Sequence, residues 1–117
     1  MNSKPVRIAY LLEYPLDLPG GAQMSTESLC MALLNEGDYF EPVVICPRLL
    51  NKEEKDYPFR IITYPMGDGR IKNLLIRIRA FHSILKREKF DIVHIQMPES
   101  LITYGLSFVR GRMIFTD

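Results

Sequence analysis

The fold is decided by the segment LEYPLDLPGGAQMSTESLCMALLNEG, residues 12–37. It ends a short apolar run, then places two consecutive glycines, Gly20 and Gly21, and enters a helical pattern. Each glycine at such a junction costs backbone entropy. The pair therefore indicates either a tight strand-to-helix turn or a place where a negatively charged group approaches bare backbone. Spacing alone gives these two interpretations equal weight.

Apolar runs and helical spacing alternate along the rest of the chain. Continuous apolar runs predict buried strands, which we place at residues 6–12, 41–47, 59–65, 91–96 and 112–117. Helical spacing predicts a helix from the glycine pair to Gly37, a long helix over residues 71–89, and a short one after Pro98 or Ser100. Strands separated by helices pair in parallel through right-handed crossovers. We therefore expect an α/β, Rossmann-like, three-layer domain with an open parallel sheet.

The expected strand order is the 3-2-1-4-5 order that is usual for this class. One connection departs from the alternation of strands and helices. The segment between the second and third strands, residues 49–58, is polar and has no clear helical pattern. We expect an irregular surface loop there.

The long helix carries an apolar stripe that we expect to pack on the sheet: Ile71, Leu74, Leu75, Ile78, Phe81 and Leu85. Its other residues are strongly basic, namely Arg70, Lys72, Arg77, Arg79, Lys86, Arg87 and Lys89 against the single acid Glu88. A solvated basic face is one interpretation. Peripheral contact with an anionic lipid surface is the other.

Composition excludes several classes of protein. A chain of 117 residues is enough for one domain, and a net charge of +1 implies no bulk attraction to nucleic acid. Cys30 and Cys46 stand in apolar surroundings without a CxxC spacing, which predicts reduced core thiols in a cytoplasmic protein. The acids are scattered and the histidines, His82 and His94, stand apart. We therefore expect no metal site.

The glycine pair is placed where phosphate groups bind in this fold class. Ligands of open α/β sheets lie beyond the carboxyl ends of the strands, and a glycine-rich link there exposes the N–H groups and the positive dipole end of the helix start. A phosphate contact at Gly20, Gly21 and Ala22 is the functional interpretation. The motifs GxGxxG and GxxxxGK[ST] are absent, which disfavours a dinucleotide-binding or P-loop enzyme.

Several motifs together resemble the N-terminal domain of glycosyltransferase family 4. They are the run LPGGAQMSTESLCMALLNEG, an apolar strand after it, and then FDIVHIQ and IFTD. Members of that family are retaining enzymes with the two-domain GT-B architecture. The resemblance implies that residues 1–117 are a single Rossmann-like domain, the acceptor-side half of a longer protein whose C-terminal donor-binding domain is absent here. It implies transfer of a sugar from a nucleotide sugar to a sugar or lipid-linked acceptor, with retention and without a cofactor or metal.

The resemblance also implies roles for individual residues. Gly20, Gly21 and Ala22 would lie against the donor diphosphate. The acceptor side of the interdomain cleft would take His94, Gln96, Thr116 and Asp117. Independently of the resemblance, we add Glu13, Tyr14 and Glu99, because loops at this edge of the sheet often carry binding groups. Many members have a histidine where this chain has Gln96. The residues alone leave alternatives open. His94 is otherwise a hydrogen-bonded core histidine, Glu13 and the nearby Asp17 are otherwise solvated loop charges, and Glu99 is otherwise an acid in the first turn of its helix.

Sugar transfer needs more than this chain displays. Negative charge on the departing phosphate has to be stabilised while the acceptor hydroxyl is held in place, and one helix N-terminus supplies only part of that. We expect residues 1–117 alone to be inactive. We expect the protein to be cytoplasmic, or peripheral at the inner face of a membrane. We also expect these residues to self-associate through the open edge of the last strand. The alternative is a stand-alone nucleotide- or phosphate-binding or interaction module on the same fold. A reading frame that continues past Asp117 into a second domain would favour the enzyme.

Overall fold

The computed structural model describes residues 4–67, 69–95 and 112–115. Its strands form one five-stranded sheet in the order β3-β2-β1-β4-β5, in which every neighbouring pair is parallel. The strands are β1 Val6–Leu11, β2 Phe40–Pro47, β3 Arg60–Tyr64, β4 Ile92–Ile95 and β5 Arg112–Phe115. The predicted open parallel sheet and its strand order are confirmed. The short helix predicted after Pro98 or Ser100 lies outside the described residues.

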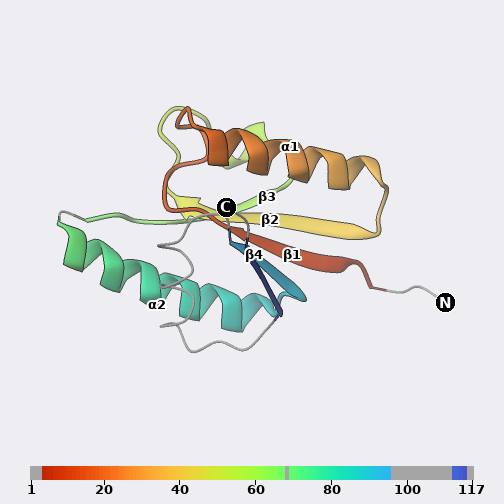
Figure 1. Ribbon diagram of the computed structural model, residues 1–117. Helices are drawn as coiled ribbons and strands as arrows, with labels where there is room; N and C mark the ends of the chain where they lie inside the picture. Colours follow the sequence, from red (N-terminus) through yellow and green to blue (C-terminus); the bar gives the residue numbers. More distant parts are fainter. Residues whose placement is uncertain (1–3, 68, 96–111, 116–117) are drawn as a thin grey trace.

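Two helices cover the two faces of the sheet, as predicted. Helix α1, Gly21–Asn35, lies on one face and helix α2, Arg70–Glu88, on the other (Figure 1). Strand β1 contributes side chains to the core on both faces of the sheet, because alternate side chains of a strand point to opposite faces. Ala9 and Leu11 pack with the side chains of α2, while Ile8 and Tyr10 pack in the cluster that includes Cys30 of α1.

The ends of the elements follow the local sequence signals. Helix α1 ends at Asn35, and Gly37 then takes a φ of 96°, in the left-handed region that glycine adopts without strain.

The link between β2 and β3 carries only a short 3-10 turn, η1 Glu54–Asp56. The two strands are nevertheless parallel. The expectation of an irregular connection is confirmed.

The predicted packing face of α2 is wrong over its first half. Ile71 and Leu75 are 77% and 56% exposed, whereas the buried residues of this helix are Arg77, Phe81, Ile84 and Leu85. The first turns of α2 project past the carboxyl edge of the sheet (Figure 1). Among the described residues no strand lies beneath those turns (Figure 1), so Ile71 and Leu75 do not enter the core.

Candidate functional site

A cavity of about 770 Å³ opens where the carboxyl ends of β1 and β2 meet the projecting half of α2. It is lined by Glu13, Tyr14, Pro15, Pro47, Arg48, Leu50, Met66, Arg70, Asn73, Leu74 and Arg77. Three of these side chains are arginines and one is an acid. Because Glu13 and Arg48 come just after the ends of β1 and β2, the cavity lies at the carboxyl edge of the sheet, where open α/β proteins bind their ligands.

Glu13 and Tyr14, two of the predicted cleft residues, line this cavity together. Glu13 follows β1 directly and is only 3% exposed, so its interpretation as a solvated loop charge is wrong. Glu13 takes part in an interaction within the protein. Tyr14 is half exposed, so its ring is available at the wall of the cavity.

Arg77 is one of the cavity residues, with Arg48 and Arg70, that the sequence did not assign to the site. It is 8% exposed, and its Nε atom is buried without a hydrogen-bond partner. Its guanidinium interacts with the hydroxyl of Tyr64, which donates a 2.9 Å hydrogen bond to the carbonyl oxygen of Leu12. Burial raises the pKa of Tyr64, so the phenol stays protonated. One sequence signal could have placed Arg77 at the site. Asn73, Leu74 and Arg77 lie three, four and seven residues after Arg70, a spacing that puts all four on one helix face.

The glycine pair lies at the open start of α1. Gly20 is the N-cap of this helix, no side chain caps it, and its first turn contains no acid. Gly21 is exposed, and nothing lies within 4 Å of the position that a Cβ would take there. A Cβ at Gly20 would clash with the amide oxygen of Gln23, but that atom is the end of a flexible side chain. Neither glycine has a φ in the left-handed region, where Gly37 and Gly69 lie.

His94 lies away from the cavity. It stands opposite Tyr10 across the β1–β4 pair, and the two rings are 5.0 Å apart and tilted by 43°. Its strand neighbours Val93 and Ile95 enter the core beneath α2, so His94 points toward the α1 face. Burial lowers the pKa of His94 below its ordinary value, which favours a neutral imidazole at pH 7. Among the described residues, His94 is not one of those that line the cavity of Glu13 and Tyr14.

Other residues considered from the sequence have structural positions or fall outside the description. The carboxylate of Asp17 accepts hydrogen bonds from the backbone N–H groups of Leu50, Asn51 and Lys52, at 2.9, 2.7 and 2.9 Å. Partial burial would raise its pKa, but these donors lower it. Asp17 thus stabilises the loop after β2. Gln96, Glu99, Thr116 and Asp117 lie outside the described residues.

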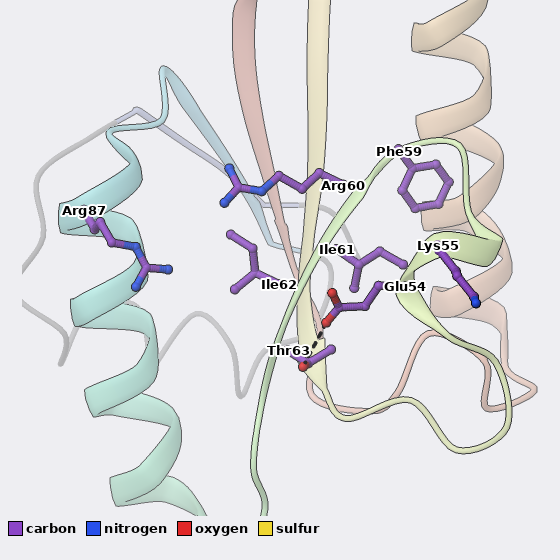
Figure 2. Close-up of a pocket in the computed structure, with 8 residues that line it drawn as sticks. All are labelled: Glu54, Lys55, Phe59, Arg60, Ile61, Ile62, Thr63 and Arg87. Carbon is purple, nitrogen blue, oxygen red and sulfur yellow. Dashed lines mark hydrogen bonds between the residues drawn. The ribbon is translucent and has the colours of Figure 1, made fainter.

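A second cavity, of about 510 Å³, lies along the outer edge of β3. Figure 2 shows Arg60 and Ile62 on the side of α2, with Glu54 and Thr63 joined by a 3.3 Å hydrogen bond on the other side. This cavity contains none of the predicted site residues. It flanks the sheet rather than lying beyond the strand ends, so it is the weaker candidate for a ligand site.

In residues 4–67, 69–95 and 112–115, no three His, Cys, Asp or Glu side chains gather into a possible metal site. Within the same residues, neither helix has an apolar stretch of the length that crosses a bilayer.

Comparison with known proteins relates the chain to glycosyltransferases. The family model for Glycosyltransferase Family 4 matches residues 19–116. A crystal structure of a glycosyltransferase from Rickettsia africae ESF-5 shares the fold with a TM-score of 0.71 at 18% identity, over 98% of this chain and 30% of that chain. The protein titled "putative UDP-N-acetylglucosamine 2-epimerase" from Listeria monocytogenes gives a TM-score of 0.63 at 14% identity, over 88% and 28% of the two chains.

At these identities the two structures show the fold alone. The chain spans less than a third of the length of either. No curated protein matches the sequence.

Proposed function

The chain belongs to glycosyltransferase family 4, and from this premise we propose that it is part of an enzyme that transfers a sugar from a nucleotide sugar to an acceptor hydroxyl. In that reaction a nucleoside diphosphate departs from the anomeric carbon. The enzyme has to stabilise the negative charge that develops on the phosphate and to hold the acceptor close to that carbon.

The donor diphosphate would lie against Gly20, Gly21 and Ala22 at the start of α1. The observation that carries this proposal is the environment of Gly21. Its backbone avoids the left-handed region and the space in front of it is open, so the fold itself has no requirement for glycine there. A glycine without a structural reason fits a position where a phosphate oxygen approaches the backbone.

The acceptor would bind on the cavity side of the cleft, at Glu13 and Tyr14. The buried carboxylate of Glu13 would accept a hydrogen bond from a sugar hydroxyl. The half-exposed ring of Tyr14 would offer the sugar a stacking surface. We keep His94, Gln96, Glu99, Thr116 and Asp117 as proposed cleft residues. His94 would then act from the α1 face of the sheet.

The finer properties are part of the same proposal. We propose transfer with retention, a GT-B arrangement in which a second domain supplies most donor contacts, and no activity for residues 1–117 alone. A cytoplasmic enzyme fits the buried free thiols of Cys30 and Cys46. The exposed Ile71 and Leu75 among the basic residues of α2 support peripheral contact with an anionic membrane. Strand β5 lies at the edge of the described sheet, and we propose self-association there.

A donor panel tests the function. The complete product of the reading frame that contains this chain is incubated with UDP-, GDP- and ADP-sugars and a mixture of acceptors, and release of nucleoside diphosphate is measured. We expect release with at least one donor, an anomeric configuration in the product that matches the donor, and no turnover by residues 1–117. Absence of release with every donor would contradict sugar transfer. An inverted product would contradict retention alone.

A further inference from the structure

We propose that the cavity between the strand ends and α2 binds a phosphate group carried by the acceptor, an inference that rests on the proposed function. The cavity brings together Arg48 from the end of β2 with Arg70 and Arg77 from α2. Glu13 is the acid among its lining residues. The balance of charge in the lining is therefore positive.

Arg77 provides the strongest argument. A buried polar atom normally has a hydrogen-bond partner, and each exception calls for an explanation. Nε of Arg77 has none, although the side chain is more than nine-tenths buried. Leaving a charged donor unsatisfied is costly. Arg77 also lines the cavity, so an anion bound there would offset the cost of burying this positive charge.

The other two arginines are available for the same anion. Among residues 4–67 and 69–95, the ion pairs formed by arginines involve Arg7, Arg60 and Arg87, and none involves Arg48, Arg70 or Arg77. Arg70 and Arg77 lie two turns apart on one face of α2. The start of that helix is fixed by the N–H group of Gly67, which donates to the side-chain oxygen of Asn73 at 2.7 Å.

A phosphate group matches this lining better than a neutral sugar does. A phosphate monoester carries nearly two negative charges at pH 7, and the planar guanidinium pairs with its oxygens through two parallel hydrogen bonds. The remaining wall contains Pro15, Pro47 and Leu74, which would pack on the apolar part of the ligand. A soluble sugar phosphate and the head group of a phospholipid share this chemistry.

Titration of the chain with defined probes tests the proposal. Chemical shifts are followed by NMR during titration with glucose 6-phosphate, glucose and inorganic phosphate. Sedimentation is measured with phosphatidylcholine vesicles with and without phosphatidic acid. The informative variants are R70Q and R48Q, because both side chains are exposed and line the cavity. The matched control is R79Q, which changes an exposed arginine of the same helix outside that lining.

We expect glucose 6-phosphate to bind and glucose not to bind. R70Q and R48Q should each weaken the binding about tenfold, while R79Q leaves it unchanged. Binding of a soluble phosphate supports a soluble acceptor. Binding only to vesicles with phosphatidic acid, weakened by R70Q but not by R79Q, supports a lipid head group.

Three results would overturn the proposal: no phosphate-dependent binding, equal weakening by R79Q and R70Q, or equal binding of glucose and its phosphate. The titration needs no turnover, so its failure removes only the phosphate assignment. Absence of release in the donor panel removes the proposed function instead.

Discussion

The hydroxyl of Tyr64, at the end of β3, donates a 2.9 Å hydrogen bond to the backbone carbonyl of Leu12, just past the end of β1. Strand β2 lies between these two strands, so the bond joins strand ends that are not neighbours in the sheet. The same hydroxyl interacts with Arg77, and the Tyr64 ring packs edge-on against Phe81 at 5.7 Å. Tyr64 thus connects the strand ends to the α2 wall of the cavity.

We predict that Tyr64→Phe lowers the free energy of unfolding by about 1 kcal/mol, because the ring stays in place while a buried carbonyl loses its donor. Urea unfolding followed by circular dichroism measures the change. Tyr39→Phe is the matched control, since Tyr39 is exposed, and it should leave stability unchanged. Equal stability of the Tyr64 variant and the unmodified chain would contradict this role for the bond.

Glu88, at the end of α2, makes the free energy of unfolding depend on pH. Hydrogen bonds from Arg60 and then from Arg7 outweigh burial and lower its pKa from 4.5 to about 2. The bond to Arg60 is 2.6 Å and that to Arg7 is 3.0 Å. A carboxylate with a depressed pKa stabilises the fold above its ordinary pKa, and this contribution is lost as pH falls from about 4.5 to about 2.

We therefore predict that Glu88→Gln lowers the unfolding free energy at pH 7 by about 1–2 kcal/mol, and that the difference from the unmodified chain shrinks as pH falls toward 2. Unfolding curves at several pH values measure it. Glu53→Gln removes an exposed ion pair with Lys55 and should have little effect at any pH. A difference that is constant with pH would show that Glu88 acts without its charge.

Thr26 of α1 is fully buried, and its hydroxyl oxygen has no hydrogen-bond partner. Valine has nearly the same shape and buries no unsatisfied polar atom. We predict that Thr26→Val leaves the unfolding free energy unchanged or raises it by about 0.5–1 kcal/mol. A loss of stability in thermal unfolding would show that the hydroxyl does have a partner.

Cys30 and Cys46 are buried free thiols, as predicted from their apolar surroundings. Burial raises the pKa of both thiols to about 12, so almost no reactive thiolate is present at pH 8. We predict that a thiol reagent such as DTNB labels neither cysteine in the folded chain and both in guanidinium chloride. Rapid labelling of either cysteine under native conditions would contradict the packing beneath α1.

Local patterns were sufficient for most of the fold. The strands of a parallel sheet are buried on both faces, so runs such as residues 6–12 are continuously apolar, and Gly37 marks the helix end by the backbone conformation that it permits. The alternation of strands and helices then leaves few topologies. For these reasons the sheet, its order and both long helices could be predicted.

The burial of Arg77 and Glu13 could not be predicted in the same way. On a helical wheel, Ile71 and Leu75 continue the stripe of Phe81 and Leu85, and nothing local shows that the sheet ends before that stripe does. The length of the helix relative to the strands is a tertiary property. An acid after an apolar strand is likewise compatible with solvent or with a cavity, and the neighbouring strand end and α2 decide between them.

The central claim is that Gly21 keeps the start of α1 open for the donor diphosphate. Gly21→Ala tests it most directly in the full-length reading-frame product, with Ser28→Ala, at an exposed position of the same helix, as the control. Because a Cβ fits without strain, we predict an unfolding free energy that is unchanged or raised by about 0.5 kcal/mol. We predict a fall of about tenfold or more in release of nucleoside diphosphate, with normal activity in the control. Full activity in the stable Gly21 variant would contradict the claim.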